Sequence, residues 1–364
     1  MNRRAVIIGG VGLGALGAGG VAAVDSVRAS RAYARASGAL RRPLAGADDL
    51  DEVVRFATLA ANGHNTQPWR FSAADGAIRI TPDLGRRTPA VDPDDHHLYV
   101  SLGCAAENLT LAARARGLMG EPEFEPAGAG LVSYAHRPGS PRPSQLCDAI
   151  PRRQSTRAEF DDRQASSADL AQLQRSAEEP GVELVLITDR RKMDEVRDLV
   201  IAGNDVQMAD AAFMAELKSW MRFNARDALR RGDGLFSAAS GNPTLPDWLG
   251  RPLFDLVFTP KAENAKYARQ IASSAGLAAF FGAGETPADW VAVGRAGQRL
   301  ALQATALGMK LSFINQPVEV AALRGELAAL AGLPWRRPDL LMRFGYGPAL
   351  PMSPRRRLDA VIDR

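Results

Sequence analysis

The chain has 364 residues, a length that suits two domains or one internally duplicated fold. With 46% hydrophobic and 24% charged residues it can bury a full core, which excludes an intrinsically disordered chain. The net charge is only +4, the arginines are spread along the chain, and aromatic residues make up 6%. Because a nucleic-acid-binding face needs clustered basic residues with interleaved aromatics, this composition argues against a nucleic-acid partner.

The first 24 residues predict an export signal. Arg3 and Arg4 stand before a glycine-rich, mildly apolar run that ends at Val24. Such a pattern favours twin-arginine export to the periplasm or cell envelope, although a run of this length also suits a membrane anchor. The small residues Ala34 and Ala36 fit a cleavage site but lie far from the run. Residues 25–45 are interpreted as a basic tether outside the fold.

The first half of the fold is expected over residues 46–150. A helix near residues 51–60 leads into a turn at residues 62–69, Asn-Gly-His-Asn-Thr-Gln-Pro-Trp. An alternating strand follows at 77–81 and an alanine-rich helix at 99–117. The histidines and cysteines show no metal-ligand spacing, so no metal site is expected. Cys104 lies in an apolar run and suggests a buried thiol, while a bridge from Cys104 to Cys147 stays open.

The second half is expected over residues 151–364. It opens with residues 152–160, in which three arginines surround a serine and a threonine. A helix at 169–178 and strands at 182–187, 310–314 and 340–346 follow, with a helix at 290–308. Residues of about 204–270 interrupt the pattern as an insertion rich in Met, Trp and Phe. The insertion is either an extra helical layer over the core or a lid over a ligand.

The helices at 99–117 and 290–308 resemble one another. At a constant offset of 191 they share eight identities in nineteen positions, including glycines at their ends and at Gly103 and Gly294. Small residues at helical spacing would let the two helices pack closely. The similarity predicts an α+β fold, with a mainly antiparallel sheet flanked by helices, built as an internal duplication in which two halves form an intrachain pseudo-dimer.

The amide-rich turn and the arginine-rich segment suggest one ligand. Amide side chains and backbone groups pair with a flat hydrogen-bonding ring, and guanidiniums bind a phosphate bidentately. Flavin mononucleotide (FMN) has this shape. The two segments together resemble the nitroreductase family of FMN proteins, and the length of the chain is closest to the long single-chain Acg-type members. In ordinary members two chains form the site, whereas here one chain carries both motifs, so a monomer is expected to be complete.

The resemblance implies roles for particular residues. Arg153 and Ser155 would contact the phosphate and ribityl chain, with Gln154 beside them and Arg157 toward the N1–C2=O edge of the ring. The turn would meet the ring through Asn62, Gly63 and Asn65. The remaining candidates are a segment beside the flavin N5 atom and a late basic pair at the phosphate: Ile314, Asn315, Gln316, Arg355 and Arg356.

Some of these residues could have a structural role and no contact with a ligand. The arginine-rich segment could be a solvated basic turn, and residues 353–357 a solvated tail. Pro68 and Trp69 are expected to shape the turn and fill the core, with Gln67 structural as well. His64 is interpreted as a satisfied structural histidine rather than a proton donor.

The resemblance implies an FMN-dependent oxidoreductase that transfers two electrons from a reductant such as NAD(P)H to a nitroaromatic or quinone. The flavin would carry the chemistry, and no side chain is assigned as catalytic. Many family members have an acidic residue and a glycine where Asn315 and Gln316 stand here. This difference supports an alternative, a protein that binds or sequesters FMN with little turnover. A third hypothesis is a flavin-free structural relative.

Overall fold

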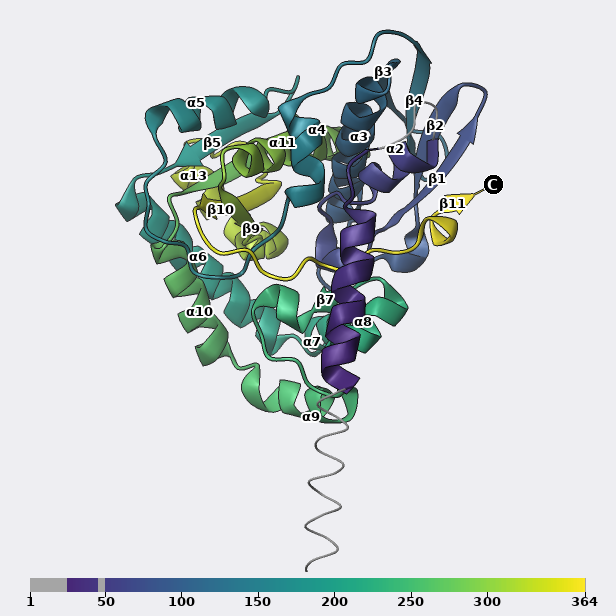
Figure 1. Ribbon diagram of the computed structural model, residues 1–364. Coiled ribbons are helices and arrows are strands. Elements are labelled where there is room, and N and C mark those ends of the chain that lie inside the picture. Colours follow the sequence, from purple (N-terminus) through teal and green to yellow (C-terminus); the bar gives the residue numbers. More distant parts are fainter. Residues whose placement is uncertain (1–24, 45–49, 364) are drawn as a thin grey trace, which may run out of the picture.

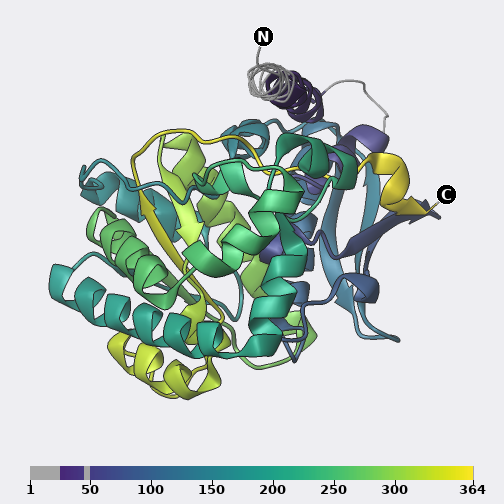
Figure 2. The same ribbon diagram turned by 90° about the horizontal axis from the view of Figure 1, so that it is seen from below.

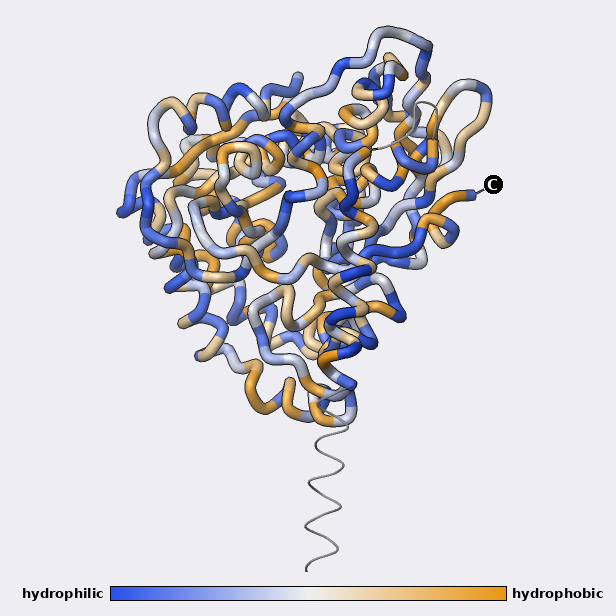
Figure 3. Tube along the Cα trace, in the orientation of Figure 1, coloured by the Kyte–Doolittle hydropathy of each residue, from blue (hydrophilic) through white to orange (hydrophobic). Residues whose placement is uncertain are grey.

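The computed structural model describes residues 25–44 and 50–363. The predicted export signal lies outside these residues. Within them, no helix is both long and apolar enough to cross a membrane. Figure 1 shows helices surrounding two sheets, and Figure 2 shows the same arrangement from below. In Figure 3 many apolar positions lie in the inner strands, and the outer helix α9 (Asp247–Val257) at the lower edge is also largely apolar.

Two crossing helices form the centre of the fold. These are α3 (His96–Ala115) and α11 (Pro287–Ala306), and each is followed by a glycine with positive φ, as a helix C-terminus favours. A Cβ on Gly103 would lie 2.1 Å from the carbonyl oxygen of Val291, and one on Gly294 would lie 2.1 Å from that of Val100. The reciprocal contacts explain why both positions are glycine. The internal duplication itself stays a prediction, because the flanking sheets differ in strand order.

A five-stranded sheet packs on one side of this pair, in the order β11 (Ile362–Asp363), β1 (Trp69–Ala74), β2 (Ala77–Pro82), β4 (Leu131–Pro138) and β3 (Leu118–Glu125). All its pairs are antiparallel except β1 with β11. Its apolar residues share one core with α3, with α2 (Leu50–Ala57) and with α4 (Gln145–Ala149). The sheet predicted as one is therefore divided in two.

The second sheet has four strands, in the order β5 (Glu183–Ile187), β8 (Gly276–Phe281), β10 (Leu340–Gly345) and β9 (Lys310–Phe313), all antiparallel. Alternate residues of β8 face opposite ways: Phe280 packs toward α11, and Phe281 packs toward α6 (Arg190–Ala209), α10 (Pro260–Ala272) and α13 (Arg324–Leu330). Burial on both faces explains why this strand reads as a continuous apolar run. The helix α5 (Ser167–Ser176) lies against α11.

The predicted insertion begins within α6 and ends within α10. Between them lie α7 (Ala211–Trp220), α8 (Ala225–Arg231) and α9 (Asp247–Val257), with the short parallel pair β6 (Met221–Arg222) and β7 (Leu235–Phe236). Their apolar side chains form a separate cluster that includes Phe213, Phe223 and Phe254. In Figure 1 these helices form the lower part of the molecule.

The segment predicted as a tether is part of the packed structure. Residues 25–40 are helical. Tyr33 is buried, its ring lies 4.7 Å from that of Phe236, and its hydroxyl donates to the carbonyl of Met352. Apolar contacts of this kind are what a free tether lacks, so the prediction for residues 25–44 is wrong.

Candidate functional site

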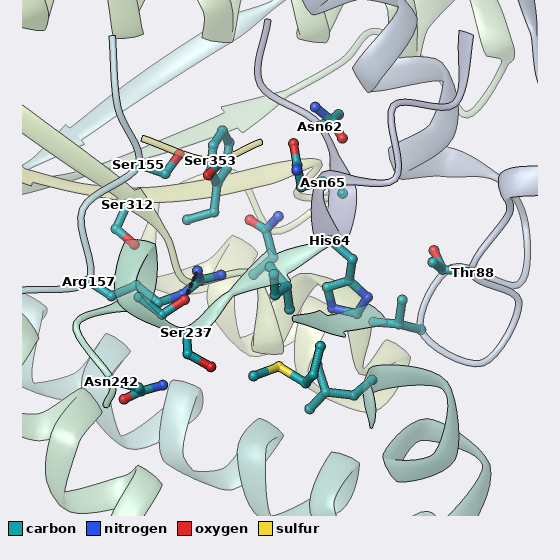
Figure 4. Close-up of a pocket in the computed structure, with 18 of the residues that line it drawn as sticks. Asn62, His64, Asn65, Thr88, Ser155, Arg157, Ser237, Asn242, Ser312 and Ser353 are labelled. Carbon is teal, nitrogen blue, oxygen red and sulfur yellow. Dashed lines mark hydrogen bonds between the residues drawn. The ribbon is translucent and has the colours of Figure 1, made fainter. Parts of the chain in front are cut away.

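A cavity of about 590 Å³ lies where the amide turn, the arginine-rich segment and the insertion meet. This volume falls in the usual range for small-ligand sites. Polar side chains converge on it from several elements, as Figure 4 shows for Asn62, Ser155, Arg157 and Ser312. The sequence candidates in its wall are Asn62, Gly63, Asn65, Arg153, Gln154, Ser155, Arg157, Asn315, Gln316 and Arg355.

The amide turn is held in an unusual backbone conformation. His64, Asn65 and Gln67 all have positive φ, between 45° and 54°, which is uncommon for residues other than glycine. Asn62 stabilises the turn, because its Oδ1 accepts from the backbone N–H of Gln67 at 2.8 Å. Backbone strain of this kind is concentrated at functional sites. Asn62 thus shapes the turn that lines the cavity.

Asn65 connects three segments of chain. Its Nδ2 donates to the carbonyls of Gly234 and Pro354, at 3.0 and 3.1 Å, and its Oδ1 accepts from Nη1 of Arg355 at 2.7 Å. Its side chain therefore joins the insertion to the C-terminal segment and orients a guanidinium. This role differs from the predicted contact with a flat ring, although Asn65 also lines the cavity.

Three guanidiniums gather in one part of the cavity wall. Burial lowers the pKa of Arg41 and Arg153 to about 10. Burial, together with the like charges of Arg41 and Arg153, also holds the pKa of Arg355 well below its usual value. Within the described residues, no carboxylate forms an ion pair with any of the three, and Nε of Arg153 has no hydrogen-bond partner. Clustered buried cations without counter-ions suit an anionic ligand group. The sequence reading missed Arg41.

Of the other residues in the arginine-rich segment, some face the cavity and others form hydrogen bonds that hold the fold together. Arg157 extends into the cavity, where Nη1 donates to Oγ of Ser240 at 3.1 Å (Figure 4). Ser155 accepts from Arg153 over 3.5 Å. Gln154 binds the C-terminal segment, since its Oε1 accepts from the backbone N–H of Leu350 at 3.0 Å. The prediction of a solvated basic turn does not hold for this segment, because Arg153 and Gln154 are buried.

The segment after β9 contributes two of its three predicted residues. Asn315 lines the cavity, but its Oδ1 accepts from the backbone N–H of Leu341 at 2.9 Å. Gln316 opens the helix α12 (Gln316–Glu319), and its Oε1 is buried without a partner among the described residues. Ile314 packs in the core behind the second sheet, away from the cavity wall. Ile314 is therefore not a side-chain contact for a ligand in this cavity.

Arg356 is absent from the cavity wall. Neighbouring residues of an extended chain point to opposite sides, so Arg355 faces the cavity and Arg356 faces away. Its backbone N–H donates to Oε1 of Gln67 at 2.9 Å, and its guanidinium reaches Asp83 at 3.3 Å. Gln67 also donates to the carbonyl of Gly232 at 2.8 Å, and Trp69 is fully buried, so the structural roles predicted for both are confirmed.

Two histidines and a carboxylate line the cavity beside the turn. Nδ1 of His64 is buried with no partner in the described chain, so His64 is not the satisfied histidine that the sequence suggested. Burial, with the nearby charge of Arg157, lowers the pKa of His64 to about 4. Nε2 of His97 lies 3.5 Å from Oε1 of Glu319. Neither His97 nor Glu319 was singled out in the sequence, because a single acidic residue at the end of a short helix has no distinctive pattern.

The insertion supplies an apolar part of the cavity wall. Its members come from α7, β6 and α9 and their flanks: Phe213, Leu217, Met221, Phe223, Leu253, Phe254, Val257 and Phe258. The cavity thus has a charged end and an apolar side, the division that a ligand with a phosphate and an aromatic ring needs. The insertion covers the cavity, and its movement as a lid stays a prediction.

Cys104 lines the cavity, whereas Cys147 is absent from its wall. Cys104 and Cys147 are both buried and free, so the structure shows no bridge between them. Burial raises the pKa of Cys104 to about 12 and that of Cys147 to about 11, which makes both thiols unreactive. Among the residues that the structure describes, no group of three or more His, Cys, Asp or Glu side chains is placed to hold a metal ion.

No family model matches the sequence. Two Mycobacterium tuberculosis proteins are similar over most of their length. One, named "Putative NAD(P)H nitroreductase Rv3131", is 25% identical over 338 residues, which cover 87% of this chain and 92% of that protein. The other, named "Putative NAD(P)H nitroreductase acg", is 23% identical over 333 residues, which cover 86% of this chain and 95% of that protein.

Solved nitroreductase structures align with part of the chain. The FMN-dependent nitroreductase NfnB of Mycobacterium smegmatis, solved with NADPH, is 15% identical and covers 56% of this chain and 88% of its own, with a TM-score of 0.38. A nitroreductase with bound FMN from Bacteroides fragilis covers 56% of this chain and 89% of its own, with a TM-score of 0.35 and 14% identity. The two relatives that align over most of the chain are both named as nitroreductases. The chain is therefore similar to the nitroreductases, and the Acg-type proteins are among its relatives.

Proposed function

We propose that the protein is an FMN-dependent oxidoreductase that transfers two electrons from NAD(P)H to an electron-poor acceptor such as a nitroaromatic or a quinone. The whole-length relatives are named as NAD(P)H nitroreductases, and the solved neighbours include FMN-bound nitroreductases. The observation that carries the proposal is the cavity itself, whose wall combines three guanidiniums without counter-ions among the described residues with a set of apolar side chains.

The residues present fit FMN. Arg41 and Arg153 would hold the phosphate, and the unpartnered Nε of Arg153 is available to it. Arg355 would add positive charge beside them, because its own donors are taken by Asn65 and by backbone carbonyls. Arg157 would lie at the N1–C2=O edge, where a cation stabilises the negative charge of a reduced ring. Gln316 has a free Oε1 for a ring N–H. When bound, the flavin supplies hydride acceptance and donation, while the side chains bind it, orient it and exclude water.

The test uses the full-length protein and its visible spectrum. The proposal expects a yellow protein that loses its colour on anaerobic addition of NADPH and regains it on addition of menadione. A colourless protein that takes up no added FMN would contradict the cofactor assignment. Release of bound flavin and its identification as FMN by mass would separate FMN from riboflavin.

A second candidate is an FMN-binding protein with little turnover. The enclosure of the cavity by α7 and α9 supports it, as does Asn315, whose side chain is tied to Leu341. The same titration separates the two, because a storage protein would stay yellow with NADPH. Dithionite serves as the control, since this small reductant would bleach a flavin that NADPH cannot reach.

We also propose that the chain acts as a monomer and is exported by the twin-arginine route. Both sets of ligand-binding residues come from one chain and line one cavity. Arg3 and Arg4 before the apolar run support export. A reporter fused to residues 1–44 is expected outside the cytoplasm and retained inside when both arginines are replaced by lysine.

A further inference from the structure

Glu319 stands in the cavity wall with an incomplete set of partners. It ends α12, three residues after Gln316, and its side chain is 18% exposed. Oε2 accepts from Nε2 of Gln207, on α6, at 2.6 Å. Oε1 lies 3.5 Å from Nε2 of His97, and this nitrogen is buried with no hydrogen-bond partner among the described residues. Within residues 25–44 and 50–363, no lysine or arginine forms an ion pair with Glu319.

The surroundings of this pair favour neutral forms. Burial is the main cause that raises the pKa of Glu319 to about 7; the charge of Asp92 adds to the rise, and the hydrogen bond from Gln207 opposes it. Burial also holds the pKa of His97 well below its usual value, with His96 beside it. The other titratable groups facing this part of the wall are Tyr267, the paired Glu263 and Lys266, and His64. A carboxyl that keeps its proton near neutral pH is a ready acid.

We propose that Glu319, positioned by Gln207 and His97, is the proton donor to the acceptor reduced in this cavity. The inference rests on the proposed function, whose acceptors need protons as well as electrons. A quinone takes a hydride that originates from NAD(P)H and one proton, which together give the hydroquinone. The O–H bond of Glu319 breaks as the O–H bond of the hydroquinone forms. The carboxylate that remains recovers its proton from water.

The variant Glu319→Gln tests the role directly, since it keeps the shape and the contact with Gln207 but carries no acidic proton. Anaerobic stopped-flow would follow flavin reduction by NADPH and reoxidation by two acceptors. Menadione requires a proton, whereas ferricyanide takes single electrons and none. We expect E319Q to slow reoxidation by menadione about 100-fold, the usual scale of general-acid catalysis, and to leave the ferricyanide and NADPH steps unchanged.

A second readout needs no turnover. Infrared difference spectra of the wild type are expected to show a protonated carboxyl band that disappears as the pH rises through about 7 and is absent in E319Q. The ratio of the menadione rate to the ferricyanide rate in the wild type should fall over the same interval. Burial also raises the pKa of Asp92 and Asp339 to about 7, so the band alone does not identify Glu319. Neither of these two carboxyls lines the cavity, so the wild-type rate ratio decides the matter even if E319Q does not fold.

The matched control is Glu263→Gln, because Glu263 also lines the cavity but is paired with Lys266 at 3.1 Å. E263Q should leave both acceptor rates unchanged. Equal slowing of menadione and ferricyanide by E319Q, or no slowing of either, would overturn the proton-donor role while the proposed function stands. A wild-type protein whose flavin NADPH cannot reduce would overturn the proposed function instead, and this role with it.

Discussion

Replacing Arg153 with methionine should weaken FMN binding with little effect on the fold. The guanidinium is buried, but its bonds within the protein are long: 3.3 Å to the carbonyl of Leu59 and 3.5 Å to Ser155. Methionine fills similar volume without charge. The main loss is therefore a charge-assisted contact to the phosphate, worth about 1.5–3 kcal/mol. At about 1.4 kcal/mol per tenfold, Kd should rise about 10- to 150-fold.

The assay is a titration of apoprotein with FMN and, separately, with riboflavin, followed by the quenching of flavin fluorescence. Because riboflavin lacks the phosphate, its affinity should be nearly the same in R153M and in the wild type. Arg152→Met is the matched control, since Arg152 is exposed and bonds only to the backbone of Asp148. If R153M weakened FMN and riboflavin equally, Arg153 would not be a phosphate ligand and the reasoning would fail.

Three further predictions concern the scaffold and the wall of the cavity. Gly103→Ala should destabilise the protein by about 1–3 kcal/mol in urea unfolding, because the added Cβ meets the carbonyl of Val291. Gly325→Ala should instead stabilise α13, because Gly325 is exposed and a Cβ there has nothing within 4 Å. Burial raises the pKa of Asp339 to about 7, so its contribution to stability is present below the unfolded pKa of about 3.9 and lost as the pH rises through about 7. Asp339→Asn should therefore flatten the fall in Tm over that interval, and an unchanged slope would assign the pH dependence to other groups. Phe254→Ala should open the apolar wall and increase iodide quenching of bound flavin; unchanged quenching would mean that α9 does not shield the ring.

Elements with strong local patterns were predictable from the sequence. The small residues of the two central helices and the apolar run of β10 follow directly from close packing and burial on both faces. The strand β8 has an equally apolar run, but it was not predicted. The sequence also predicted that the amide turn and the arginine-rich segment come together, and most of the predicted residues do line one cavity. What the pattern could not supply was the direction of single side chains, which is why Arg355 and Arg356 were assigned alike.

The missed residues acquire their roles only through tertiary contacts. Arg41 lies in a basic stretch that is indistinguishable in composition from a solvated tether, and only the packing of Tyr33 against Phe236 brings it to the cavity. Glu319 and His97 are far apart in the chain and meet because α12 and α3 converge on the cavity wall. Asn65 was found, but its hydrogen bonds to Gly234 and Pro354 depend on an insertion whose path the sequence did not reveal.

The helix over residues 25–40 predicts that the position of any proteolytic cut near the N-terminus affects ligand binding. A peptidase cut after Ala36, where small residues allow one, would remove Tyr33 and its bond to Met352. Arg41 would remain, but the helix that presents its guanidinium to the carbonyl of Ser353 would be shortened to its last few residues. A chain processed at that position should load FMN less tightly than one cut before residue 25. A cut before residue 25 would therefore keep the whole helix. A cut within the helix is expected to give a protein that releases FMN more readily and loses its yellow colour on storage.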